Sequence, residues 1–265
     1  LLKTITLHPR AGNPPPRIVE VAGGILNSIG LPNKGIERWL TETFPKVRGH
    51  ASKLFLNIAG ERTDEWPRIA ARIGSTPGID ALELNISCPN VEQGGLPFAR
   101  DPETVGQLVR VVKNETPIPL IVKLAPESPD IGGNALAAQE NGATAVSLIN
   151  TIRAMAVDWR TRKPKLGYGF GGLSGPAVKP VALRLVHEVA RRVTIPVIGI
   201  GGIATADDVL EFLVAGATAV QVGTAAFRDP RALATIIDEL PALLRGAGAA
   251  HVRDLTGTLR MPGAR

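Results

Sequence analysis

The 265-residue chain has little cysteine, few aromatic residues and no long apolar run. Its single cysteine, Cys88, excludes an intrachain disulfide and any metal or iron–sulfur site made only of cysteines from this chain. No apolar stretch approaches the ~20 residues that a membrane-spanning helix requires. The N-terminus also lacks the charged start and the apolar segment of a signal peptide. We therefore expect a cytoplasmic location and no membrane association.

Basic residues outnumber acidic ones, with a net charge of +6 and a pI near 9.8. Such a balance fits nucleic acid, anionic small molecules or no particular partner. Because few aromatic residues lie among the basic ones to stack on bases, we expect no nucleic-acid binding. The segment from Arg160 to Lys165 is a cluster of positive charge that fits either docking of an acidic partner or a solvated loop. The four histidines are far apart and lack ligand spacing, so we expect no metal site.

Short apolar runs alternate with helical stretches along the chain. The expected strands cover residues 1–6, 53–58, 80–86, 119–124, 145–149, 196–200 and 219–222. The expected helices cover residues 64–73, 101–115, 130–141, 179–192, 205–214 and 230–244, with a short helix in the tail from 250 to 265. Strict alternation with continuously apolar strands is typical of a parallel sheet covered by helices. No break in composition marks a boundary, so we expect one domain over residues 1–265.

The spacing favours a TIM (β/α)8 barrel over an open doubly wound sheet. A Rossmann fold would carry a glycine-rich turn after its first strand, and here the stretch from Gly199 to Gly202 comes late and lacks the third spaced glycine. Seven strands are expected where a closed barrel needs eight. The simplest account is that the first strand of the barrel is absent from this chain.

Cys88 lies in the stretch Asn85-Ile86-Ser87-Cys88-Pro89-Asn90, directly after an apolar run. Proline has no N–H to donate, so Pro89 ends the strand pairing. A thiol between two carboxamides at the end of a strand indicates a functional site. A buried structural cysteine is the alternative, because free cysteine is among the most buried residue types.

Polar or glycine residues end nearly every expected strand. They are Lys3, Asn57, Asn85 with Cys88, Lys123, Asn150 with Thr151, Gly201 with Gly202, and Gly223 with Thr224. Active sites of TIM barrels lie at these carboxyl ends, so we predict one shared site rather than separate strand caps. The loops after the last two strands often bind phosphate through backbone N–H groups, which predicts a phosphorylated cofactor, with tight turns as the alternative. Lys123 fits either stabilisation of negative charge on that cofactor or a structural salt bridge.

Several separate stretches together resemble one enzyme family. They are Lys3 with residues 6–10, residues 26–33, 83–90, 122–124, 149–151, 171–176 and 199–202, and Gly223-Thr224. In this order they resemble the class 1 dihydroorotate dehydrogenases, flavin enzymes that oxidise (S)-dihydroorotate to orotate in pyrimidine (UMP) biosynthesis. Thr-Leu-His-Pro-Arg at 6–10 and Gly-Gly-Leu-Ser-Gly-Pro at 171–176 are similar to the B-type catalytic subunit. This resemblance implies a homodimer core, a separate FAD and iron–sulfur electron-transfer subunit, and NAD as the final acceptor.

The resemblance also implies roles for individual residues. Cys88 would be the general base that removes a proton from the substrate while a hydride passes to FMN. The substrate would be held by Lys3, Asn27, Ser28, Ile29, Gly30, Leu31, Asn85, Asn150 and Thr151. FMN would be held by Lys3, Thr4, Asn57, Asn85, Lys123, Ile149, Gly175, Gly201, Gly202, Gly223 and Thr224. Carboxamides suit a flat pyrimidine because each offers both a donor and an acceptor.

The family has a further N-terminal segment that includes the first barrel strand. An open barrel exposes strand edges, so we expect this chain alone to fold poorly or to bind FMN weakly. Three other functions stay open: a flavin barrel that reduces pyrimidine bases, like dihydropyrimidine dehydrogenase, the fumarate-linked A-type enzyme, and a non-catalytic phosphate-binding barrel. A base reductase would have no substrate carboxylate for Lys3 to bind, and a non-catalytic barrel would not need Cys88.

Overall fold

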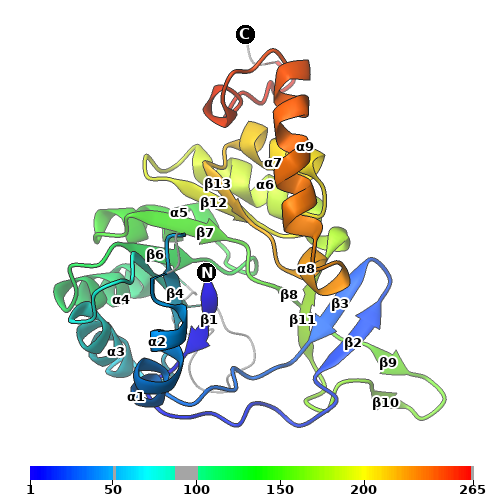
Figure 1. Ribbon diagram of the computed structural model, residues 1–265. Helices are drawn as coiled ribbons and strands as arrows, with labels where there is room; N and C mark the ends of the chain where they lie inside the picture. Colours follow the sequence, from blue (N-terminus) through cyan, green and yellow to red (C-terminus); the bar gives the residue numbers. More distant parts are fainter. Residues whose placement is uncertain (50–51, 87–100, 264–265) are drawn as a thin grey trace.

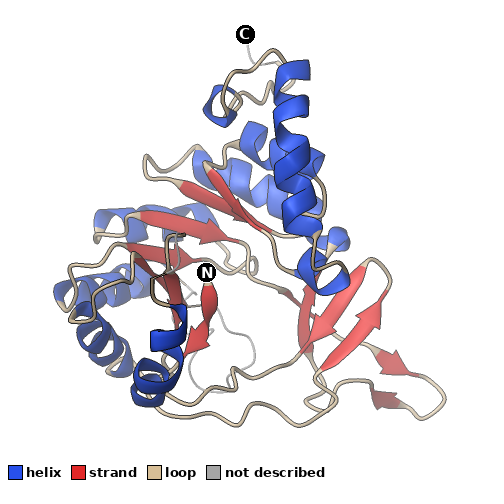
Figure 2. Cartoon of the chain, viewed as in Figure 1, coloured by secondary structure: helices blue, strands red, loops and turns tan. Residues whose placement is uncertain are grey.

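The computed structural model describes residues 1–49, 52–86 and 101–263. Its main sheet is parallel, with strands in the order β1 (Leu2–Ile5), β4 (Phe55–Ile58), β5 (Ala81–Asn85), β6 (Leu120–Lys123), β7 (Ala145–Leu148), β12 (Val197–Ile200) and β13 (Ala219–Gln221). The sheet curls, with helices along its outer side (Figure 2). This arrangement confirms the predicted barrel type, and the described residues supply seven parallel strands of it. Within the described ranges, β1 and β13 form the two edges of the sheet.

The main helices follow the strands in sequence, as the alternation predicted. They are α3 (Glu65–Gly74), α4 (Pro102–Asn114), α5 (Ile131–Glu140), α6 (Lys179–Ala190), α7 (Ala206–Ala215) and α9 (Ala232–Gly246). Side chains begin three of them: Asp101 accepts a hydrogen bond from the N–H of Thr104, and Asp130 accepts one from the N–H of Gly133. Thr205 starts α7 in a capping box. Because capping residues are recognisable in the sequence, the starts of these three helices were predicted closely.

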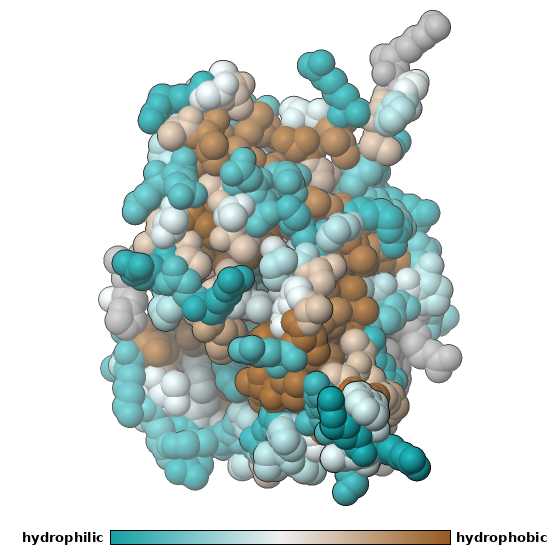
Figure 3. Space-filling model, turned by 90° about the vertical axis from the view of Figure 1, so that its right-hand side faces the viewer, coloured by the Kyte–Doolittle hydropathy of each residue, from teal (hydrophilic) through white to brown (hydrophobic). Residues whose placement is uncertain are grey.

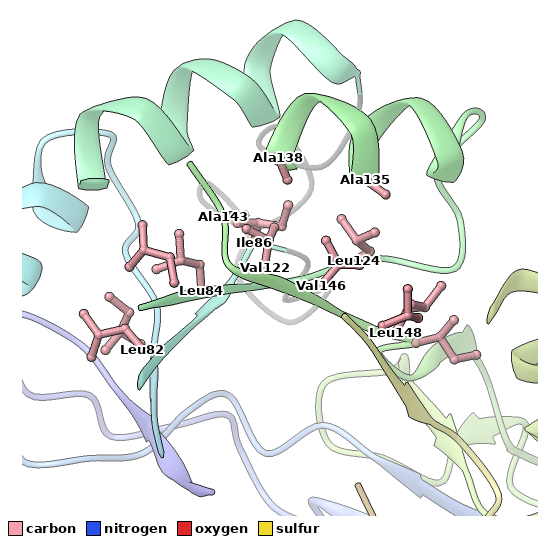
Figure 4. Close-up of a cluster of buried hydrophobic side chains, with 14 of the residues drawn as sticks. Leu82, Leu84, Ile86, Val122, Leu124, Ala135, Ala138, Ala143, Val146 and Leu148 are labelled. Atoms are coloured by element: carbon pink, nitrogen blue, oxygen red, sulfur yellow. The ribbon is translucent and has the colours of Figure 1, made fainter. Parts of the chain in front are cut away.

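The outer face of the barrel strands forms the large hydrophobic core. Figure 4 shows aliphatic side chains of β5, β6 and β7 pointing toward α4 and α5, among them Leu84, Val122 and Val146, which are fully buried. Small residues of α5, Ala135 and Ala138, let that helix pack close to the strands. Burial of such side chains contributes roughly 1.5–3 kcal/mol each, so this layer supplies much of the stability.

A second sheet lies at the carboxyl-end side of the barrel and is antiparallel. Its order is β2 (Ile18–Val21), β3 (Gly24–Asn27), β11 (Gly171–Ser174) and β8 (Ile152–Ala154). Sequence did not predict it, because its strands are short and β11 is Gly-Gly-Leu-Ser, a poor strand former. A Cβ at Gly171 would lie 2.5 Å from the main-chain oxygen of Asn27, so the pairing of β3 with β11 requires glycine there.

Short elements complete the chain. They are α1 (Ile36–Arg38), the π-helix η1 (Trp39–Thr43), α2 (Phe44–Val47), β9 (Val157–Asp158), β10 (Lys163–Pro164), the 3₁₀ helix η3 (Pro176–Val178), α8 (Thr224–Arg228) and the 3₁₀ helix η4 (Val252–Asp254). The expected helix from 230 to 244 is preceded by α8 and starts at Ala232. The expected tail helix is only the single turn of η4.

The β9–β10 hairpin projects at the lower right of Figure 1 and carries the basic cluster. Trp159 is exposed there, and the guanidinium of Arg160 lies 4.5 Å from its ring centre. The side of the molecule shown in Figure 3 mixes apolar areas with charged side chains. Among the described residues, no helix combines the length and apolar character needed to cross a membrane.

Candidate active site

The inner face of the barrel changes character from one end to the other. At the amino ends of the strands it is apolar, with Phe55, Ala81, Ile121, Ala145 and Ile198 in one small cluster. Side chains alternate between the two faces of a strand, so residues two apart share a face. Two residues further along, four of these five strands carry a polar side chain on that face, and only β12 keeps an apolar one, Ile200. The barrel interior is therefore filled with hydrophobic side chains at the amino ends of the strands and is polar toward their carboxyl ends. Active sites of barrel enzymes lie at the carboxyl ends.

Glu83 of β5 is the centre of this polar layer and has no exposed surface. Its Oε1 accepts a hydrogen bond from Asn57 Nδ2 at 2.6 Å. Its Oε2 accepts bonds from Ser147 Oγ at 2.9 Å and from Gln221 Nε2 at 2.8 Å. The ammonium of Lys123 lies 3.8 Å from Oε1. One carboxylate thus joins side chains of β4, β6, β7 and β13.

Thr4 extends the layer to β1. Its hydroxyl donates to Asn57 Oδ1 at 2.5 Å, which turns the amide nitrogen of Asn57 toward the Glu83 carboxylate. Lys3, the preceding residue, is exposed, and the register of β1 against β4 shifts between Leu2 and Ile5. The predicted residues Thr4, Asn57 and Lys123 therefore meet inside the barrel.

A second contact lies nearer the carboxyl ends. Asn150 Nδ2 donates to Asn85 Oδ1 at 3.0 Å, across 65 residues of sequence. The backbone N–H of Thr151 donates to Asn150 Oδ1 at 2.9 Å. Asn85 is in register with Lys123 on the neighbouring strand, so the two predicted carboxamides lie beside the ammonium-bearing strand end. Ile149 directly precedes Asn150 and donates its backbone N–H to the oxygen of Ile200.

The antiparallel sheet brings the predicted substrate loop to the same end. Asn27 ends β3, is in register with Gly172, and donates from Nδ2 to the Gly172 oxygen at 3.2 Å. A Cβ at Gly172 would collide with Thr151 Oγ1, so Thr151 lies directly against this strand. Strand β11 thereby connects Asn27 with Thr151.

The rest of that loop has a tight backbone. Gly30 and Leu31 have φ values of 75° and 54°, a conformation that is uncommon for a leucine. Ser28 is fully buried, and its N–H donates to the oxygen of Arg17 at 2.8 Å. Asn33 fastens the loop to the segment after β1, since its Nδ2 donates to Thr6 Oγ1 at 2.8 Å. Asn33 belongs to the matching stretch, but sequence gave it no role.

The predicted phosphate glycines lie in loops packed closely together. Gly175, Gly201 and Gly202 have φ values of 106°, 133° and 75°, which favour glycine. A Cβ at Gly202 would lie 2.9 Å from the oxygen of Gly175 and 2.8 Å from Lys179 Cβ. At Gly223 a Cβ would meet no atom within 4 Å, and the adjoining Thr224 donates from Oγ1 to Ser174 Oγ at 2.8 Å. This cradle of closely packed glycine loops, with the Thr224 hydroxyl beside it, fits a phosphate group.

Behind the cradle is a compact charge cluster. Lys179 Nζ lies 2.5 Å from Asp208 Oδ1 and 2.8 Å from Glu211 Oε2. Burial acts to raise the pKa of Asp208, but hydrogen bonds from Lys179 and from the N–H groups of Ala204 and Thr205 outweigh it and lower that pKa. Hydrogen bonds to Asp208 and Glu211 raise the pKa of Lys179. The cluster fixes the start of α7 beside Gly202.

Cys88 lies outside the described residues, so its predicted role is not tested by the geometry. Sequence reasoning missed Glu83, Ser147 and Gln221, which complete the interior network. The signal for Glu83 was present, because a carboxylate between Leu82 and Leu84 in a buried strand requires partners. Ser147 and Gln221 carried no such signal, since their contact with Glu83 spans 64 and 138 residues.

Fold and site together define an α/β-barrel protein with a polar, carboxamide-lined site at the carboxyl ends of its strands. Residues 1–244 match the family model described as dihydroorotate dehydrogenase. The chain belongs to this family.

Curated relatives match along nearly the whole chain. A protein of Geobacillus kaustophilus called "Dihydroorotate dehydrogenase B (NAD(+)), catalytic subunit" is 47% identical over 264 residues, 100% of this chain and 84% of that protein. A "Putative dihydroorotate dehydrogenase A (fumarate)" of Solibacter usitatus is 46% identical, covering 98% of this chain and 86% of that protein. The crystal structure of DHODH from Eimeria tenella in complex with ferulenol has a TM-score of 0.78 and 25% identity. That match covers 96% of this chain and 77% of the Eimeria chain.

Proposed function

We propose that this chain catalyses the flavin-dependent oxidation of (S)-dihydroorotate to orotate in de novo pyrimidine biosynthesis. Family membership along residues 1–244 supports it. The structural observation that carries it is the convergence of Asn27, Asn85, Asn150 and Thr151 at the end of the barrel that also holds Lys123. Such a cluster offers paired donors and acceptors to a flat pyrimidine and a positive charge to an electron acceptor.

The cofactor is FMN, for which the described residues provide a fitting set. Gly175, Gly201, Gly202 and Gly223, with Thr224, would hold the phosphate. The ring system of FMN and its side chain would lie where the interior network ends. The residues that would hold them are Lys3, Thr4, Asn57, Asn85, Lys123 and Ile149. When bound, FMN accepts a hydride from the substrate.

The chain's own residues bind the substrate and move a proton. Asn27, Asn85 and Asn150, with the backbone of residues 28–31, would orient the ring, and Lys3 would contact its carboxylate. Cys88 would remove the proton from the carbon next to a ring carbonyl. Because a thiol has an ordinary pKa of ~8.5, neighbours such as Ser87 would assist that transfer at neutral pH.

The relatives support two candidate electron acceptors. Several are named as catalytic subunits of the NAD-linked enzyme, which supports a partner subunit for electron transfer. From the family resemblance, we propose that this partner carries FAD and an iron–sulfur cluster, that this chain forms a homodimer, and that the protein is cytoplasmic. The Solibacter relative supports fumarate as the second candidate acceptor. Reoxidation of the reduced protein by fumarate alone, measured by stopped flow, would identify the fumarate-linked type.

The proposal is tested by mixing FMN-loaded protein with dihydroorotate without oxygen and following the flavin absorbance. We expect bleaching in the native chain and bleaching at least about 100-fold slower in Cys88→Ala, because a general base contributes 10²–10⁴-fold. Equal rates would remove Cys88 from its role. Flavin that never bleaches with dihydroorotate but bleaches with dihydrouracil would identify a pyrimidine-base enzyme instead.

A further inference from the structure

Glu83 has no role in the proposed mechanism, although four side chains of the barrel interior contact its carboxylate. It has no exposed surface, so its charge is not solvated by bulk water. Side chains from three strands, Asn57, Ser147 and Gln221, donate hydrogen bonds to its two oxygens. The Thr4 hydroxyl fixes the orientation of the Asn57 amide, so the nitrogen faces the carboxylate. Both carboxylate oxygens therefore have hydrogen-bond donors inside the barrel.

Lys123 is the positive charge beside that anion. Its Nζ lies 3.8 Å from Glu83 Oε1, and its side chain is 17% exposed where that of Glu83 is 0% exposed. The carboxylate is therefore the deeper partner, and the ammonium is the one nearer the open end of the barrel. Below both lies the apolar cluster of Phe55, Ala81 and Ile121, so little water screens the pair from beneath.

We propose that Glu83 is the buried counter-ion of Lys123, a positioning residue that anchors the ammonium at the cofactor site and lowers the reduction potential of bound FMN. The inference rests on the proposed function for its cofactor. Reduction adds negative charge to the flavin, and a fixed carboxylate behind Lys123 offsets part of the attraction that the ammonium alone would exert. Glu83 thus sets the net charge that the reduced cofactor meets.

Burial of the Glu83–Lys123 pair costs desolvation free energy, which a purely structural role does not require. A buried ion pair is often no more stabilising than apolar residues of the same volume, yet removal of one partner leaves an uncompensated buried charge. The same interior is filled by Phe55 and Ile198 one layer lower, so an apolar solution is available in this barrel. A carboxylate at Glu83 is better explained by the charge it supplies.

The first test is the midpoint potential of FMN bound to the full chain, measured by stepwise chemical reduction without dihydroorotate. Glu83→Gln removes the charge and keeps the shape, since the Ser147 hydroxyl can rotate and the Gln221 amide can flip to satisfy the new amide. We expect a more positive potential in Glu83→Gln, a more negative one in Lys123→Gln, and a value near the native one in the double variant. Ser147→Ala, which loses a hydrogen bond but no charge, should leave the potential unchanged. An unchanged or more negative potential in Glu83→Gln would overturn the proposal.

The second test needs no cofactor and examines the pairing itself. Thermal unfolding of the cofactor-free chain should show a lower Tm for Glu83→Gln and for Lys123→Gln, and a Tm for the double variant above that of the worse single variant. Losses that simply add would contradict the ion pair. If the native chain bound no FMN even when FMN was supplied in large excess, the proposed cofactor and the tuning role would both be refuted. The cycle would still decide whether Glu83 and Lys123 act as a pair.

Discussion

Glu83 and Leu84 are adjacent in β5 and lie on opposite faces of the same strand. Leu84 is fully buried against the helices with Val122 and Val146, and its position requires only an aliphatic side chain of suitable size and shape. Glu83 is equally buried but depends on partners from β4, β6, β7 and β13. The comparison teaches that the outer face of the barrel provides stability and the inner face provides charge and hydrogen-bonding chemistry.

Glu83→Ala should break the inner face most severely. It leaves Lys123 and three hydrogen-bond donors without their shared acceptor, so we expect a loss of about 3–5 kcal/mol in the free energy of unfolding. FMN retention should fall as well. Chemical denaturation, with flavin content measured on the folded fraction, checks both; a smaller loss in Glu83→Gln is the matched control. Native stability in Glu83→Ala would show that the network is dispensable.

Leu84→Ala should damage the outer face by a comparable or slightly smaller amount. We expect a loss of about 2–4 kcal/mol, because a buried leucine leaves a cavity when truncated. FMN affinity and midpoint potential of the folded protein should stay at native values, since the side chain points toward the helices. A shifted potential in this variant would mean that the two faces are not separate in function.

Ser147→Ala tests how much a single hydrogen bond of the inner face contributes to stability. Its hydroxyl donates to Glu83 Oε2 at 2.9 Å, and bonds to charged groups are worth about 1.5–3 kcal/mol. The exposed Ser75, which donates to the oxygen of Arg72, provides the control: Ser75→Ala should change stability by less than about 0.5 kcal/mol. Equal effects in the two variants would argue against a special interior.

Asp208→Asn tests a charge cluster on the outer layer and should have the smallest effect, about 1 kcal/mol at neutral pH. The folded pKa of Asp208 lies below its ordinary value of 3.8, so its contribution is present above about pH 4 and is lost as the pH falls through the folded pKa. The stability difference between the native chain and Asp208→Asn should therefore shrink on acidification. A difference that grows toward low pH, in unfolding curves from pH 7 to pH 3, would contradict this assignment.

The alternation of strands and helices was largely predictable, and so were several end residues of the site. The caps at Asp101, Asp130 and Thr205 marked helix starts, and Asn57, Asn85, Lys123 and Asn150 were identified because polar residues ending apolar strands stand out. The antiparallel sheet was not predictable, because its pairing of Asn27 with Gly172 joins residues 145 apart through a glycine-rich strand.

The order of strands and helices and the position of polar residues along each strand could be read from the sequence, because both depend on local geometry and on which side chains tolerate burial. The sequence also determined the family, through motifs spread over the chain. Which polar residues share a partner depends on the three-dimensional fold. Asn57, Lys123, Ser147 and Gln221 come from four strands and contact Glu83, and Thr4 of a fifth strand joins them through Asn57. They meet because curling of the sheet brings one face of all these strands around a common centre.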